Sequence, residues 1–218
     1  MTSFRLLASE LSAIARQVRL ITILDAASTV GLSPLALSPL HTLAYFADAL
    51  APVWGLPVVD GQILKRHRPY YPSMQHDLDL LVGIGVVQVS DVRYVSGEET
   101  WHLDADYELN YELARPVLSA IENLPLQARQ AGFIREVVYS TCGLGLDGLV
   151  SASTVDPAYS DPVVAENNIL DVAPDVGLNR SATLALRFAD LLGPSSHLSE
   201  AELVNLYVRQ LYEWLNAA

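Results

Sequence analysis

The sequence predicts a mainly α-helical fold with a small β-hairpin, in which a winged helix-turn-helix-like N-terminal domain precedes a helical C-terminal lobe. In several long stretches apolar residues recur every three or four positions, which is the period of an amphipathic α-helix. Between residues 86 and 108 the period changes to two, which is typical of β-strands. The charge is also uneven, because residues 1 to 90 are neutral on balance and residues 91 to 218 carry the whole net charge of −12.

The first helix is predicted over residues 3 to 28, and Gly31 and Pro34 end it. Its apolar side chains share one face, so we expect a buried helix. These side chains are Phe4, Leu7, Leu11, Ile14, Val18, Ile21 and Leu24. A hydroxyl followed by proline, Ser38-Pro39, is a start signal for the second helix, which is predicted over residues 39 to 50.

A short extended segment, VVDGQIL, comes next, and the basic loop KRHRPYYP follows it. Pro72-Ser73 opens a third helix that is predicted to run to Leu81 or Val82. Residues 86 to 95 and 100 to 108 then alternate apolar and polar side chains and predict a hairpin. Helix, helix, short strand, helix and hairpin is the order of a winged helix-turn-helix, which we assign to residues 1 to 110.

Residues 111 to 218 are predicted to form an acidic helical lobe. A helical stretch from Leu113 to Val138 is expected to break or kink near Pro116 and Pro125. Residues 139 to 180 are rich in Gly, Ser, Pro, Asp and Asn and predict a long irregular connection. Two helices follow, over residues 181 to 192 and 198 to 216. Ser199 and Glu202 have the spacing of a capping box at the start of the second.

Composition excludes several classes of protein. A net charge of −12 argues against a general nucleic-acid binder, because such binding depends on Lys and Arg. The single Cys142 excludes an internal disulfide, and no Cys/His cluster indicates a zinc site. Pro34 and Pro39 interrupt the uncharged stretch 26 to 47, so no membrane span is predicted. We expect a cytoplasmic protein with no metal and no cofactor.

Catalytic chemistry is not predicted, although a few residues were candidates. His41 and Asp48 lie seven positions apart on one helix, where they would serve as a proton relay or, as we favour, as structural hydrogen-bonding groups. His76 and Asp79 lack further metal ligands at a recognisable spacing. Cys142 has no base nearby in sequence, and the GLGLDG segment after it lacks the lysine of a phosphate loop, so we predict a turn there. A hydrolase using His41, Asp48 or Cys142 is therefore the lowest-ranked hypothesis.

Partner contacts are the favoured use of the surface. The only basic cluster with aromatic neighbours lies in the loop after the second helix, and its candidate contact residues are Lys65, Arg66, Arg68, Tyr70 and Tyr71. The third helix, which would read the DNA major groove, contains Asp77 and Asp79 and no Lys or Arg. A hydrophobic fraction of 51% predicts an apolar surface facing a partner, with Trp54 among the candidate anchors alongside Trp101 and Trp214.

The central block resembles the Panacea (SocA-type antitoxin) domain. The residues that carry the resemblance are Leu40, His41, Leu43, Tyr45, Phe46 and Asp48, the turn Arg68-Pro69-Tyr70-Tyr71-Pro72 and the passage from Leu78 to Val89. Two positions depart from the family pattern, because Thr42 replaces its usual lysine and Arg68 replaces the glycine before its turn proline.

The same block, with AYSDPVVAENNILDV at 158 to 172 and the closing LYVRQLYEWL, is similar to the middle components of three-component conflict systems built around an ABC or SMC-like ATPase. This resemblance implies a non-catalytic adaptor in a bacterial antiviral defence complex, with an SMC-like or ABC ATPase and an effector, such as a nuclease, as partners. The alternative is a DNA-binding regulator or antitoxin-like protein that uses the basic loop 65 to 71.

Overall fold

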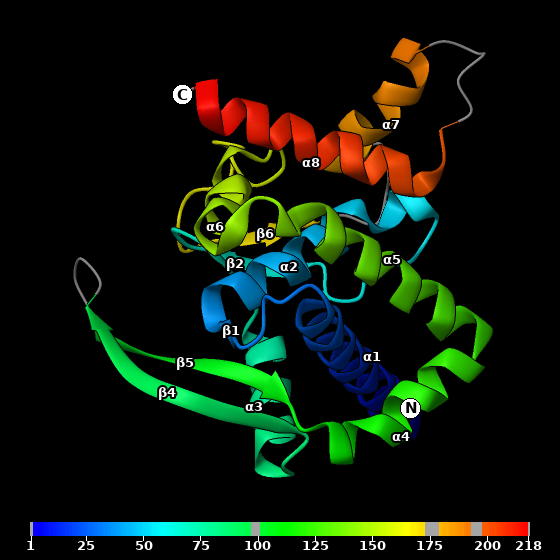
Figure 1. Cartoon of the computed structure of the whole chain (residues 1–218), viewed down its shortest axis with the longest axis vertical. Coiled ribbons are helices and arrows are strands. Elements are labelled where there is room, and N and C mark those ends of the chain that lie inside the picture. Colours follow the sequence, from blue (N-terminus) through cyan, green and yellow to red (C-terminus); the bar gives the residue numbers. More distant parts are fainter. Residues whose placement is uncertain (1, 97–100, 173–178, 193–197, 218) are drawn as a thin grey trace.

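The computed structural model describes residues 2–96, 101–172, 179–192 and 198–217. Over these ranges the chain is mainly helical and contains two small three-stranded antiparallel sheets (Figure 1). The predicted class, mainly α with a small β-hairpin, is confirmed at this coarse level. The helices are α1 (Thr2–Thr29), α2 (Leu37–Leu50), the short 3-10 helix η1 (Ala51–Trp54), α3 (Pro72–Gly83), α4 (Tyr111–Asn123), α5 (Pro125–Cys142), α6 (Gly145–Val155), α7 (Arg180–Leu192) and α8 (Glu200–Ala217).

Helix α1 has the predicted bounds to within a residue but is only partly buried. Its C-terminal half enters the core, where Leu20, Ile23 and Leu24 are fully buried. Leu11 and Ile14 lie on the predicted apolar face, yet they are 66% and 56% exposed. The expectation of a buried helix is therefore wrong for this part of α1, because no other described element covers these two side chains.

Helix α2 forms the centre of the molecule, and every residue from Pro39 to Leu50 is buried. It packs against α1, α5, α6 and α7, which surround it in Figure 1. A helix that is apolar on all sides is expected in such a position, because no face of it meets water. His41 and Asp48, which belong to this helix, are consequently buried as well.

The first sheet contains the predicted hairpin. Strand β4 (Val87–Ser96) pairs antiparallel with β5 (Trp101–Leu109), and β1 (Leu35–Ala36) pairs with the other edge of β5, which gives the order β1-β5-β4. A bulge in β4 between Ser90 and Arg93 places Asp91 at a positive φ of 47°. The hairpin projects well beyond the helices (Figure 1), so its outer part has solvent on both faces.

The second sheet joins distant parts of the sequence. Strand β2 (Gln62–Lys65) pairs with β3 (Pro69–Tyr70) on one side and with β6 (Ile169–Asp171) on the other. The extended segment was predicted near β2, but its pairing with β6 was not. This pairing holds the basic loop between β2 and β3 against the C-terminal half of the chain.

The C-terminal half departs from prediction in two places. Pro116 lies inside α4 without ending it, whereas the break predicted near Pro125 is confirmed, because α4 ends at Asn123 and α5 begins at Pro125. Residues 139–180 are not one irregular connection, because α5 continues to Cys142 and α6 follows over Gly145–Val155. GLGLDG therefore opens a helix rather than forming an isolated turn. Small residues such as Ala152 and Ser153 are fully buried in α6, which packs closely on α2.

The start of α8 confirms the predicted capping box. The Ser199 Oγ accepts a hydrogen bond from the Glu202 N–H at 3.3 Å, and the Glu202 carboxylate accepts one from the Ser199 N–H at 2.7 Å. None of the described helices is both long and apolar enough to cross a membrane. One hydrophobic core cluster contains residues from both sides of residue 110, and the division into two domains there stays a prediction.

Candidate interaction surfaces and buried polar clusters

Lys65 is held within the protein rather than presented to a partner. Its Nζ donates hydrogen bonds to the carbonyl oxygens of Asp161 and Val164, both at 2.7 Å. The ammonium also lies 5.8 Å from the centre of the Tyr159 ring. These contacts satisfy two of its three donors, so Lys65 fastens the loop to the segment before β6.

The rest of the basic loop is divided between surface and core. Arg66 and Arg68 are exposed; the Arg66 guanidinium lies 4.6 Å from the centre of the half-buried Tyr70 ring, and Arg68 donates to the Ser38 Oγ at 3.1 Å. Tyr71 is fully buried and cannot touch a partner.

Trp54 is also largely committed to the fold. Its half-buried ring packs against Phe133 at 5.6 Å between ring centres, and its carbonyl oxygen accepts a hydrogen bond from Arg129 at 2.6 Å. Trp214 packs partly buried against the core, and the Trp101 side chain lies outside the described residues. The predicted aromatic anchors that are described thus serve mainly as core.

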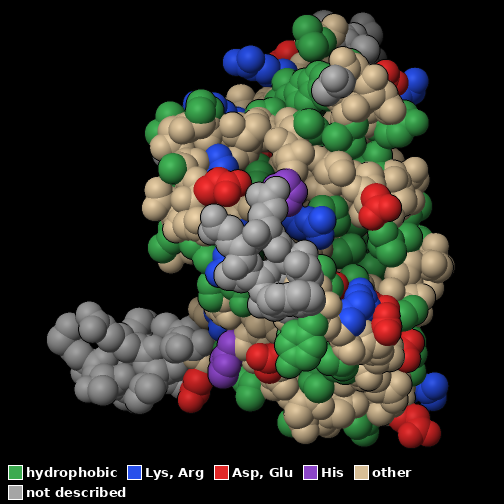
Figure 2. Space-filling view, turned by 90° about the vertical axis from the view of Figure 1, so that its left-hand side faces the viewer, with side chains coloured by type: hydrophobic (Ala, Val, Ile, Leu, Met, Phe, Trp, Pro, Cys, Tyr) green, Lys and Arg blue, Asp and Glu red, His purple; other side chains and the backbone are tan. Residues whose placement is uncertain are grey.

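Figure 2 shows the side of the molecule from which the hairpin projects. Among the described residues on this face, Lys and Arg side chains are scattered between Asp and Glu side chains and form no continuous basic patch. Hydrophobic side chains are exposed between them. A phosphate backbone is bound by a cluster of positive charges, and the described residues of this face present no such cluster.

The third helix, α3, uses its acidic residues within the protein. Asp77 is buried and accepts a hydrogen bond from the Arg16 Nε at 2.5 Å, which ties α3 to α1. Asp79 accepts one from the Gln75 amide at 2.9 Å. In the described part of the chain no three His, Cys, Asp or Glu side chains are grouped so that they could hold a metal.

His41 has protein partners at both ring nitrogens. Its Nδ1 accepts a hydrogen bond from the Tyr71 N–H at 3.1 Å, and its Nε2 lies 3.4 Å from the Gln75 Oε1. The ring stacks on Tyr70 at 4.9 Å. Burial lowers the pKa of His41 to about 4, and the positive charge of Arg19 acts in the same direction. His41 is therefore a neutral, structural side chain at pH 7.

This pKa predicts an acid-sensitive contribution to stability. Because the folded-state pKa of about 4 lies below the ordinary value of 6.5, the contribution is complete above pH 6.5 and is lost as the pH falls towards 4. We expect the loss to be about 3 kcal/mol of unfolding free energy. Urea unfolding of wild type and His41→Gln between pH 7 and 4 measures it. The stability of wild type relative to the variant should fall by this amount as the pH falls, and parallel curves would contradict this assignment.

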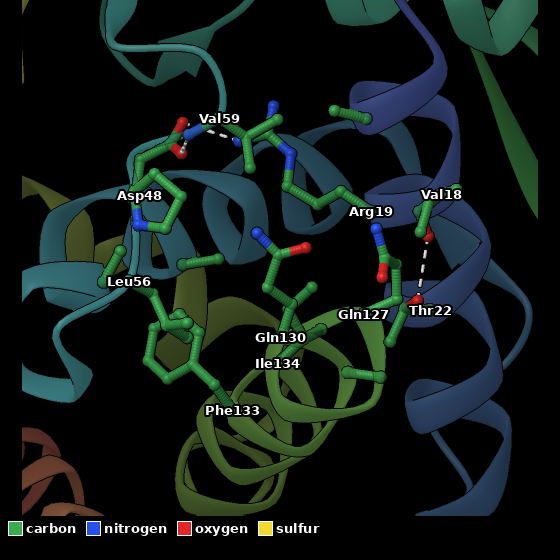
Figure 3. Close-up of a pocket in the computed structure, with 15 residues that line it drawn as sticks. Val18, Arg19, Thr22, Asp48, Leu56, Val59, Gln127, Gln130, Phe133 and Ile134 are labelled. Atoms are coloured by element: carbon green, nitrogen blue, oxygen red, sulfur yellow. Dashed lines mark hydrogen bonds and ion pairs between the residues drawn. The ribbon is translucent and has the colours of Figure 1, made fainter. Parts of the chain in front are cut away.

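Asp48 forms a buried ion pair with Arg19 of α1, as Figure 3 shows. The Arg19 Nη1 donates to the Asp48 Oδ2 at 2.6 Å, and both side chains are almost fully buried. The Asp48 Oδ1 also accepts from the Val59 N–H at 3.0 Å. Burial raises the pKa of Asp48, and the positive charge of Arg19 acts against this. Burial also lowers the pKa of Arg19, but the negative charge of Asp48 opposes this, and the pKa of Arg19 lies above its ordinary value. We assign the pair as ionic, since a neutral Asp48 would leave a buried guanidinium uncompensated.

A small pocket lies beside this ion pair. Its volume is about 30 Å³, and its walls come from α1, from the α2–η1 region and from α5, with Gln127 and Gln130 among the α5 residues (Figure 3). Such a volume suits a few water-sized occupants and not a substrate of metabolite size. Two buried nitrogens of Arg19, Nε and Nη2, have no hydrogen-bond partner in the described part of the protein.

Asp156 was missed by the sequence analysis and is the most connected buried carboxylate described. It follows α6 and accepts hydrogen bonds from the phenols of Tyr45 and Tyr207, from the Ser181 hydroxyl at 2.7 Å and from the Ala158 N–H at 3.0 Å. Burial raises the pKa of both phenols well above the ordinary value, so they remain protonated donors. One carboxylate thus joins α2, α6, α7 and α8.

Cys142 shows no activated geometry. Its thiol is half-buried at the end of α5 and contacts the carbonyl oxygen of Tyr139 at 3.0 Å. A catalytic thiol needs a neighbouring base or positive charge to become a thiolate. The contact with a carbonyl oxygen supplies neither.

Two exposed apolar faces were not identified from the sequence as surfaces. On the hairpin, Tyr94 is 75% and Leu103 54% exposed, and they lie directly opposite each other in the strand register. On α1, Leu11 and Ile14 are exposed to a similar degree. In Figure 1 the hairpin extends to the left while the N-terminal end of α1 lies right of the centre, so these faces are separate.

Comparison of the chain with family models, with curated proteins and with solved structures finds no match.

Proposed function

We propose that the chain is a non-catalytic adaptor that joins an SMC-like or ABC ATPase to an effector, such as a nuclease, in a bacterial defence complex. The observation that carries this proposal is the pair of separate exposed apolar faces, one at Tyr94 and Leu103 and the other at Leu11 and Ile14. Large apolar side chains in water favour burial against a partner. Two separate faces of this kind suit a protein that holds two partners.

The proposed fold of residues 1–110 is a winged helix-turn-helix in which the wing contacts protein. The order α1, β1, α2, α3, β4, β5, with β1 on the free edge of β5, supports it. The β2–β3 strands, inserted between α2 and α3, are an addition to the simple pattern. Because α3 has no Lys or Arg and its Asp77 is used in an ion pair with Arg16, protein contact fits it better than the DNA major groove.

The polar residues at the candidate catalytic positions support a non-enzymatic role. His41 has a partner at each ring nitrogen, Asp48 is bound to Arg19, and the Cys142 thiol faces a carbonyl oxygen. Each of these groups has a structural use, and none has the partner that would activate it.

Affinity purification of the tagged protein from its own host tests the proposal, with the masses of all co-eluting chains determined. Co-elution of a large ATPase and a second enzyme in fixed stoichiometry is expected. A lone chain would contradict the adaptor function.

DNA binding through the basic loop is the second candidate, because Arg66 and Arg68 are exposed at the β2–β3 turn. A lone chain that binds duplex DNA, with an affinity that falls steeply with salt, would favour it. The binding should then disappear in the Arg66→Glu, Arg68→Glu variant. Affinity retained in that variant would exclude this loop as the DNA contact.

A further inference from the structure

The apolar face of the hairpin continues from the core out into solvent. The odd-numbered residues of β5 share one face, since side chains alternate along a strand. At the base of this face Ala105, Tyr107 and Leu109 are buried, and β5 contacts α1 and α2 there. Farther out on the same face, Leu103 is 54% exposed. The described part of the hairpin is thus covered by helices at its base only.

Tyr94 belongs to the same outer face. It is paired with Leu103 across the two strands, and directly opposed side chains in an antiparallel pair lie on one side of the sheet. It is 75% exposed. An isolated two-stranded ribbon is only marginally stable in water, and an apolar sheet face is normally covered by another layer. Helices cover the base of this face, so we expect a further helix to cover its outer part.

The opposite face of the hairpin is acidic. Arg93 is surrounded by three carboxylates: Asp91 at 2.7 Å, Asp104 at 3.2 Å and Asp106 at 3.0 Å. One arginine cannot neutralise three carboxylates, so negative charge remains. By sequence the segment 87–109 carries one arginine and six acidic residues, which are Asp91, Glu98, Glu99, Asp104, Asp106 and Glu108.

We propose that the outer apolar face of the hairpin, formed by Tyr94 and Leu103, binds a positively charged amphipathic helix of a partner protein. The apolar side of that helix covers Tyr94 and Leu103. Its Lys or Arg side chains are long enough to reach around the narrow ribbon to the carboxylates of the opposite face. This inference rests on the adaptor function proposed above, and it specifies the kind of segment that one of the two partners presents. A second copy of the chain does not suit the site, because two such hairpins would repel each other.

The probe for this site is a fluorescein-labelled peptide of 18 residues made of Leu and Lys, with Leu at every third and fourth position. Titration with the full-length protein, followed by fluorescence anisotropy, gives the affinity. In the Tyr94→Glu, Leu103→Glu variant we expect the affinity to fall roughly tenfold or more, because two central apolar contacts are lost. The added negative charge would by itself strengthen attraction to the peptide, so a fall reports the apolar contact.

The matched control is Val163→Glu, Leu191→Glu. These side chains are 84% and 79% exposed, lie outside the hairpin and add the same charge. The affinity of the control variant for the peptide should stay within roughly twofold of the wild-type affinity. Loss of one interface anchor has a larger effect than this. Equal affinities for both variants, or equally tight binding of a peptide with the same composition but no apolar face, would overturn the inference. Sedimentation supplies a second test. A dimer of the wild type that becomes a monomer in the hairpin variant would also overturn the inference, because a second copy would then cover the face.

These results separate the site from the function. The chain could bind the peptide selectively and still purify from its host without partners. This result would refute the ATPase and effector as partners and leave the proposed binding surface in place. The converse result is that peptide binding is not selective and that the partners co-purify equally with wild type and with the hairpin variant. It would refute the proposed binding surface and leave the adaptor function in place.

Discussion

Asp156→Ala is expected to destabilise the protein by roughly 4 kcal/mol, which approaches the whole stability of many domains. The substitution removes the acceptor shared by Tyr45, Tyr207 and Ser181, all of which are buried. Each buried hydroxyl left without a partner costs about 1 to 3 kcal/mol. Equilibrium unfolding in urea, followed by circular dichroism, measures the effect.

Asp190→Ala is the control for this experiment. Asp190 is an exposed carboxylate on α7, so its removal should change the unfolding free energy by less than about 0.5 kcal/mol. Equal stability of Asp156→Ala and Asp190→Ala would show that Asp156 does not hold the helices together.

The second large effect is expected at the ion pair between Arg19 and Asp48. Arg19→Met or Asp48→Asn alone leaves one buried charged group without its partner, and each should cost about 3 to 5 kcal/mol. The double variant removes both charges and retains an oxygen for the Val59 N–H. It should therefore be more stable than the sum of the single losses implies, by at least about 1 kcal/mol.

A double-mutant cycle by urea unfolding gives the coupling directly. Additive losses would mean that the two side chains do not interact in the folded protein. Glu10→Gln serves as the reference for a neutralised carboxylate, because Glu10 is exposed on the same helix as Arg19 and should be close to neutral in effect.

The elements of the N-terminal half could be predicted because their signals are local. The apolar period of α1 and the alternation in β4 and β5 lie within short windows of sequence. Their bounds agree with the prediction to within a few residues. The predicted cap of α2 is wrong, because the helix begins at Leu37 and its N-cap residue is Ala36, not Ser38. The exposed end of α1 could not be foreseen, because the apolar period shows which side chains share a face and not whether another element covers them.

The missed features depend on contacts between distant residues. Helix α6 is rich in Gly, Ser and Thr, residues that local rules assign to loops, and it is stabilised by close packing on α2. Asp156 has no local signal beyond its position after α6, since Tyr45 lies 111 residues away in sequence. Lys65 was predicted as a surface contact because the carbonyl oxygens that bind it come from a segment almost 100 residues later.

The candidate contact residues divide in the same way. Sequence placed Arg66 and Arg68 in a basic loop, and both are exposed there. Tyr71 was also predicted as a contact residue, but it is buried beside Arg19. This position follows from the packing of α1 against α3, which local sequence does not show. The strongest surface signal, the apolar outer face of the hairpin, depends on where the helices that cover its base end.

The most direct test of the adaptor function is to separate its two contacts by mutation. The tagged wild type, the Tyr94→Glu, Leu103→Glu variant and the Leu11→Glu, Ile14→Glu variant are each purified from the native host, and the masses of the co-eluting chains are determined. All four side chains are largely exposed, so both variants should fold. We expect wild type to retain two partners and each variant to lose a different one. Absence of any partner from wild type would contradict the proposed function, and retention of both partners by both variants would contradict the assignment of its contacts to these two faces.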